Sequence, residues 1–93
     1  MESGNDKLIE VRKKIDLVDE QMKKLFLERM ELADCVAVIK AESGEAIYNP
    51  DREKAMLERL AANVEPKFQE PYIRFLKEIL SISKDYQKKR MLA

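Results

Sequence analysis

Arg29 is the residue whose position points most directly to chemistry. It interrupts an apolar seam that recurs at alternating intervals of three and four residues. The other members of the seam are Leu8, Val11, Ile15, Val18, Met22, Leu25, Leu32, Val36 and Ile39. This spacing is typical of a helix that packs against other helices along its whole length. An unpaired guanidinium there would cost several kcal/mol of desolvation, so we expect an anionic partner, either a side chain or a ligand.

Two further cations can be related to Arg29 by helical geometry. Lys40 follows it by three turns plus ~20°, on the same face and ~16 Å away, so the two side chains could hold one small anion between them. Arg12 precedes Arg29 by ~25 Å along the axis and is rotated by ~100°. No small metabolite could touch both arginines of one chain. If Arg12 is functional, it must serve the site of another subunit.

Polar side chains also stand on the inward stripes of two other predicted helices. Glu53 extends the stripe of Leu57 and Leu60 by one turn, and Ser83 and Gln87 extend a second stripe at a spacing of four residues. Ordinary explanations exist for each of them. An early Glu favours the helix dipole, and a Ser or Gln near a helix end is often partly exposed.

Arg52 and Arg29 also have explanations that involve no ligand. Arg52, in the run Asp-Arg-Glu-Lys, would by default be a solvated surface charge. A buried Arg–Glu pair between helices would satisfy Arg29 without any ligand.

Helix-breaking residues divide the chain into three helices, so the expected fold class is all-α. We expect these helices at about residues 6–42, 50–64 and 71–90. Their boundaries are marked by Asn5 or Asp6 as a first cap, Ser43-Gly44 as a stop, Asn49-Pro50 as a second start, and Pro66 and Pro71 around a short connection. We expect a single domain over residues 1–93.

The difference in helix length predicts the assembly. The first helix would be ~55 Å long, and the two shorter helices cannot cover its whole seam. A second copy of the chain could cover it. We therefore expect an intertwined helical homodimer.

Composition excludes several kinds of function. The 93 residues carry 18 basic and 18 acidic side chains, and no basic tract or membrane-length apolar run is present, so we expect no nucleic-acid or membrane partner. The absence of His and the single Cys35 exclude histidine acid–base chemistry, a Cys/His pair and a Cys/His zinc site. We expect no metal or cofactor. The single Cys and the polar N-terminus, which is unlike a signal sequence, suggest the cytoplasm.

Several stretches of the chain together resemble one known family, the all-helical class of chorismate mutase. The resemblance lies in residues 11–19, 27–33, 39–40, 49–53 and 83–87, in this order and spacing. It covers nearly the whole chain. It implies an intertwined dimer with two active sites and no cofactor, in which Arg12 completes the partner's site and Arg29 binds a substrate carboxylate.

The remaining site roles follow from the same resemblance. Lys40 and Gln87 match the pair that hydrogen-bonds the ether oxygen of the substrate, and Glu53 matches the acceptor for the ring hydroxyl. Arg52 and Ser83 match further residues around the carboxylates. Asn49 departs from the family, since some relatives have Asp near the ring hydroxyl, and this affects fine positioning.

The implied reaction is the Claisen rearrangement of chorismate to prephenate, an isomerisation of the shikimate pathway toward phenylalanine and tyrosine. Two other functions remain open. One is an isochorismate-pyruvate lyase on the same scaffold, and the other is a non-catalytic helical dimerisation or regulatory module. The sequence also leaves open whether the chain acts alone or is a fragment of a bifunctional enzyme, whether Phe or Tyr regulates it, and its rates.

Overall fold

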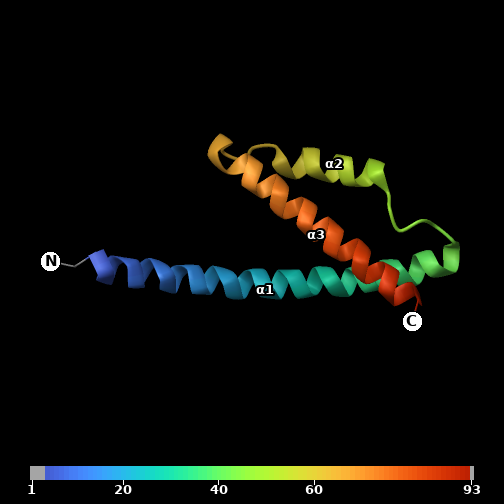
Figure 1. Cartoon of the computed structure of the whole chain (residues 1–93), viewed down its shortest axis with the longest axis horizontal. Coiled ribbons are helices and arrows are strands. Elements are labelled where there is room, and N and C mark those ends of the chain that lie inside the picture. The colour runs from blue at the N-terminus through green and yellow to red at the C-terminus, as the bar shows by residue number, and fades with distance from the viewer. Residues whose placement is uncertain (1–3, 93) are drawn as a thin grey trace. The chain divides into compact units, whose positions relative to one another are not determined.

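Three helices and no strand make up residues 4–92, the part of the chain that the computed structural model describes (Figure 1). They are α1 (Gly4–Ser43), α2 (Pro50–Ala61) and α3 (Pro66–Leu92). The all-α prediction is confirmed. The expected domain of 1–93 also includes residues 1–3 and 93, which lie outside the described residues. The structure consists of two units that meet within α1, one ending at Glu31 and one starting at Leu32, and each is described by itself.

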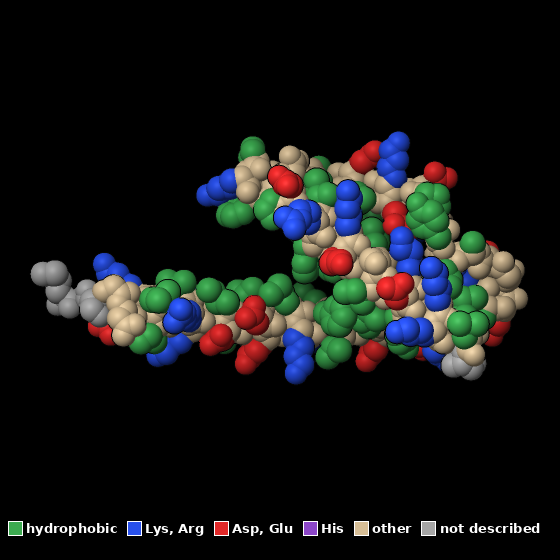
Figure 2. Space-filling view, viewed as in Figure 1, with side chains coloured by type: hydrophobic (Ala, Val, Ile, Leu, Met, Phe, Trp, Pro, Cys, Tyr) green, Lys and Arg blue, Asp and Glu red, His purple; other side chains and the backbone are tan. Residues whose placement is uncertain are grey.

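The first unit is the N-terminal part of α1. The helix begins at Gly4, so Asn5 and Asp6 lie in its first turn, and the prediction that one of them caps the helix was wrong. The seam is solvent-exposed in the single chain, with exposed fractions of 50% at Val11 and Ile15 and 61% at Leu25. Figure 2 shows hydrophobic side chains along this stretch, toward the N-terminal end of the molecule. This apolar surface is available to a partner.

The second unit begins with the last turns of α1, where Ala33 and Ala37 are buried. Gly44 ends the helix in the left-handed conformation, with φ of 78°, which glycine adopts at little steric cost. Its amide donates to the Lys40 carbonyl at 2.8 Å, and so satisfies one of the acceptors left free at the helix end. The predicted stop at Ser43-Gly44 is confirmed.

The start of α2 is also as predicted, but its end is not. The Asn49 side chain accepts from the Arg52 amide at 3.1 Å and Pro50 opens the helix. The helix ends at Ala61 rather than near residue 64, because Ala62 is extended and Asn63 has φ of 65°. Asn tolerates this conformation better than most residues, since its short polar side chain can bond locally.

The third helix begins at Pro66, five residues earlier than expected, and Pro71 lies inside it. The prediction treated Pro71 as a breaker, and this was wrong. As the sixth residue of the helix, Pro71 removes the one backbone hydrogen bond that its position would donate to the Lys67 carbonyl, and the helix continues through it. The turn before α3 is fixed by other bonds: Gln69 Nε2 donates to the Ala61 carbonyl at 3.3 Å, and the Phe68 amide donates to the Glu65 carbonyl at 2.9 Å.

The helices α2 and α3 contact each other and diverge from the turn that joins them (Figure 1), and the predicted apolar stripes of both are at least partly buried. Met56, Leu57 and Leu60 of α2 are partly buried, and Leu76 of α3 is 4% exposed. Because these stripes face inward, the polar residues that continue them also face inward. No helix within residues 4–92 is long and apolar enough to cross a membrane.

Candidate active site

Ser83 and Gln87 are the most buried polar side chains that the structure describes, at 5% and 7% exposure. They lie one turn apart on the inner face of α3, and Gln87 Nε2 donates to Ser83 Oγ at 3.0 Å. Gln87 Oε1 is buried with no hydrogen-bond partner among the described residues. The prediction that this stripe carries polar groups inward is confirmed. A side-chain amide has two N–H donors, so one donor of Gln87 is left for another acceptor.

Glu53 lies in the first turn of α2 and forms a salt bridge with Lys84 of α3. Lys84 Nζ is 3.1 Å from each carboxylate oxygen of Glu53, and the two side chains are only 27% and 21% exposed. The same ammonium lies 4.6 Å from the centroid of the Tyr48 ring, a cation–π distance. One lysine therefore joins α3, α2 and the segment before α2.

Lys40 lies in the last turn of α1 and is also directed to that segment. Its Nζ donates to the Ile47 carbonyl at 2.9 Å in a partly buried contact. An ammonium has three donors, so this bond leaves two for a ligand. The segment is thus held at Ile47 by a lysine of α1 and at Tyr48 by a lysine of α3.

Asn49 and Arg52 are both exposed. Asn49 Oδ1 already accepts from the Arg52 amide, so the structure assigns Asn49 a capping role. The Arg52 side chain extends from the first turn of α2, at the same end of the helix as Glu53.

Arg12 and Arg29 belong to the first unit, where Arg12 is exposed and Arg29 is partly exposed. Their placement toward Lys40, Glu53 and Gln87 stays a prediction. The second unit therefore brings Ser83 and Gln87 together and pairs Glu53 with a residue outside the predicted set.

The end of α3 is tied to the last turns of α1 by a polar network around Asp34. Asp34 Oδ1 accepts from the Tyr86 hydroxyl at 2.7 Å and from Arg90 Nε at 2.8 Å. The Tyr86 bond, aided by the Arg90 charge, holds the pKa of Asp34 below its ordinary value. The same bond raises the pKa of Tyr86. Since Tyr86 precedes Gln87 in the chain, this network fixes the part of α3 that carries the buried amide.

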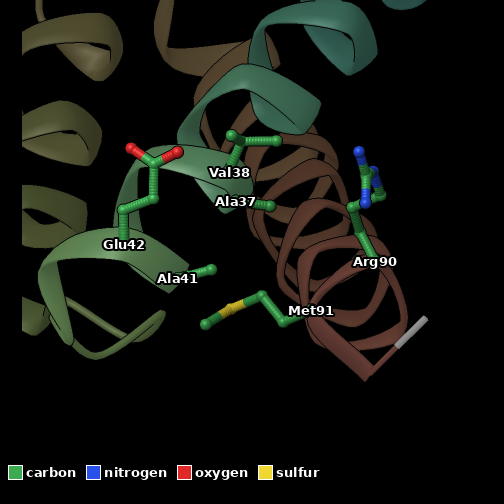
Figure 3. Close-up of a pocket in the computed structure, with 6 residues that line it drawn as sticks. All are labelled: Ala37, Val38, Ala41, Glu42, Arg90 and Met91. Atoms are coloured by element: carbon green, nitrogen blue, oxygen red, sulfur yellow. The ribbon is translucent and has the colours of Figure 1, made fainter.

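An open hollow of about 250 Å³ lies beside this network (Figure 3). Its lining residues are Ala37, Val38, Ala41, Glu42, Arg90 and Met91. In Figure 3 the Met91 side chain points toward Ala41, with the charged Glu42 and Arg90 side chains also at the hollow. None of the lining residues was predicted to bind a ligand. Within residues 4–92, no group of three or more His, Cys, Asp or Glu side chains is placed to hold a metal ion.

Lys84 is the residue that the sequence did not single out. It follows Ser83 directly and Leu80 by four residues, at the edge of the inward stripe, where a lysine is usually a solvated charge. Its long, flexible side chain reaches Glu53 on α2. The signal that could have found it is Glu53 itself, because an inward carboxylate needs a cation.

Comparison with known proteins places the chain in a family. Residues 11–88 match the family described as chorismate mutase type II. The chain belongs to this family. The match includes all eight predicted site residues: three on α1, the cap of α2 and two residues on α2, and two on α3.

Three relatives agree with this assignment to the chorismate mutase type II family. A chorismate mutase of Methanocaldococcus jannaschii is 47% identical over 55 residues, which is 59% of this chain and 56% of the relative. A bifunctional chorismate mutase/prephenate dehydratase of Aquifex aeolicus is 30% identical over 95% of this chain and 26% of the relative. A T-protein of Haemophilus influenzae is 41% identical over 55% of this chain and 14% of the relative. The chain thus spans about half or less of the length of each relative.

Proposed function

We propose that this chain is a chorismate mutase, an enzyme that rearranges chorismate to prephenate. The observation that carries the proposal is the family match over residues 11–88. Inward polar groups at Glu53, Ser83 and Gln87 support it, because they stand where a purely structural bundle would have apolar side chains. The step would belong to phenylalanine and tyrosine biosynthesis.

The proposed chemistry is electrostatic and conformational. The reaction is a unimolecular pericyclic rearrangement, so the protein has to bind a dianion and fold its enolpyruvyl arm over the ring. Arg29 and Arg52 would hold the carboxylates, and fixing both carboxylates would favour the reactive conformer. Ser83 would contribute a further hydrogen bond near a carboxylate.

Two donors would act on the bond that breaks. As the C–O bond of the ether opens, negative charge grows on its oxygen. Lys40 has two donors beyond its bond to Ile47, and Gln87 has one beyond its bond to Ser83. Directed to the ether oxygen, they would stabilise the transition state more than the ground state.

Glu53 would accept from the ring hydroxyl of the substrate. A carboxylate has about four lone-pair positions, so pairing with Lys84 leaves room for this bond. Asn49 would lie near the same hydroxyl, with its side-chain oxygen engaged as the cap of α2.

A homodimer is part of the proposal. The exposed seam of α1 offers an apolar surface for a second copy, and Arg12 lies on the part of α1 that carries it. The partner subunit's Arg12 would complete each site. A cytoplasmic location is also proposed, on the ground of the single, free Cys35.

Product analysis tests the proposed reaction. The purified chain is incubated with chorismate and, separately, with isochorismate. Prephenate from chorismate, without pyruvate release from isochorismate, is the expected result. Pyruvate from isochorismate alone would identify a lyase instead.

A non-catalytic module is the alternative that one contact favours, because it predicts that Glu53 pairs with a protein group, as it does with Lys84. Calorimetry with a bicyclic transition-state analogue separates the two functions. Binding supports the enzyme, and no heat of binding by a folded dimer would favour the module.

A further inference from the structure

We propose that Lys84 is a positioning residue for the reaction, which holds Glu53 in place and cancels its charge toward a dianionic substrate. This inference rests on the proposed function. Its basis is the geometry of one ammonium group that contacts a carboxylate on α2 and an aromatic ring before α2.

The position of Lys84 Nζ is defined from two sides. It lies 3.1 Å from each oxygen of Glu53, so it bridges both oxygens rather than touching one. The centroid of the Tyr48 ring lies 4.6 Å from the same nitrogen. These two contacts restrict the Lys84 side chain before any substrate binds. It therefore loses less conformational freedom on substrate binding than an unrestrained lysine would.

The Lys84–Glu53 pair is largely buried, which distinguishes it from an ordinary surface salt bridge. Exposed salt bridges contribute little, because water screens them. Here both side chains are about three-quarters buried, at 27% and 21% exposure. A carboxylate in this setting needs a counter-charge, and Lys84 supplies it.

The need for this charge follows from the substrate. Glu53 is an anion in a site proposed to bind two carboxylates. Without Lys84, its charge would repel the substrate. At an effective dielectric constant of about 20 and a separation of ~10 Å, a unit repulsion weakens binding by roughly tenfold. Lys84 thus allows Glu53 to accept a hydrogen bond from the ring hydroxyl of a substrate that itself carries two negative charges.

The test is a set of three variants assayed for chorismate turnover. Lys84→Met is expected to raise KM by about tenfold while kcat changes by less than about threefold, because ground-state binding of the dianion is lost. Adding Glu53→Gln to Lys84→Met should bring KM back toward that of Glu53→Gln alone, because the unbalanced charge is removed. Lys84→Arg should keep KM within about twofold of wild type, since Arg also pairs with a carboxylate.

Lys77→Met is the matched control, because Lys77 is an exposed lysine of the same helix. It should leave KM and kcat unchanged. Thermal unfolding of every variant is followed in parallel. A merely structural salt bridge would lower the melting temperature of Lys84→Met with KM unchanged, and this would overturn the inference.

A second kinetic outcome would also overturn it. A rise of KM in Lys84→Met without any relief from Glu53→Gln would make Lys84 a direct substrate ligand. If Lys84→Met fails to fold, Lys84→Gln replaces it in the same comparison. An inactive wild-type chain would refute the proposed function and this inference together, whereas an active wild type with an unchanged Lys84→Met would refute the inference alone.

Discussion

At the scale of single residues, the proposed mechanism depends on two donors: the buried amide of Gln87, and Lys40, which already donates to the Ile47 carbonyl. Ser83 and Gln87 were predicted to face inward from helical spacing alone, and their burial confirms it. Lys84 could not be predicted in the same way. It lies at the edge of the inward stripe, four residues after Leu80, where spacing does not decide between solvent and a partner; its contact with Glu53 does.

Lys40→Ala should lower turnover by about 100-fold or more, because a donor preorganised for the ether oxygen is lost. The fold should be retained, since the contact removed is one bond to the Ile47 carbonyl. Steady-state kinetics and circular dichroism measure both effects. Wild-type turnover in the variant would remove Lys40 from the mechanism.

Gln87→Glu should retain activity only at acidic pH. The amide donates at every ordinary pH, whereas a carboxyl group donates only when it is protonated. At a site that is 7% exposed, burial would raise the pKa of the new carboxyl and extend the active range upward. The pH profile of kcat/KM for the variant and wild type is the measurement. Profiles of the same shape would contradict the contact proposed for Gln87.

At the scale of elements, capping residues set the boundaries that were predicted well. Gly44 and the Asn49-Pro50 pair are local signals, so they could be recognised in the sequence. The end of α2 depends on the conformation of Asn63, and the start of α3 depends on whether the helix continues through Pro71. The connection is also held by the bond from Gln69 Nε2 to the Ala61 carbonyl, which joins residues eight positions apart and is not reported by a local pattern.

The Asp34 network should make the stability of the second unit depend on pH. The folded pKa of Asp34 is lowered, so its contribution is present above about pH 4, the unfolded value, and is lost as the pH falls through the folded pKa. The folded pKa of Tyr86 is raised, so its contribution is present below about pH 10 and is lost as the pH rises through the folded value.

Tyr86→Phe should therefore unfold at a lower urea concentration than wild type at neutral pH. The difference should shrink in strong acid, where Asp34 is protonated, and above the folded pKa of Tyr86. The effect should be smaller than that of Leu76→Ala, a core truncation that typically costs about 2–5 kcal/mol. An unchanged urea midpoint at neutral pH would show that the 2.7 Å bond does not stabilise the unit.

At the scale of the whole molecule, the exposed seam of α1 and the exposed Arg12 are the basis for proposing an active site shared between two subunits. Mixed dimers test this. Arg12→Ala and Lys40→Ala chains, each carrying a different tag, are co-refolded and the heterodimers are purified. About half of the wild-type activity should return, because one of the two composite sites is intact in a cyclic dimer.

Each variant refolded alone is the control and should stay inactive. Light scattering at micromolar concentration verifies the dimer. A well-folded monomer in that measurement, or verified heterodimers without activity, would argue against an active site shared between two subunits. Sequence spacing alone could suggest a role for Arg12 in a second subunit, but it could not establish that role, because the proposed partner is a separate chain.

The most direct test of the central claim is the rate of chorismate loss, followed by absorbance, with the purified chain at increasing substrate concentration. We expect loss far above the spontaneous rate, saturation with substrate, and prephenate as the product, as the match to the chorismate mutase type II family over residues 11–88 implies. A folded sample that consumes chorismate no faster than buffer alone would contradict the claim.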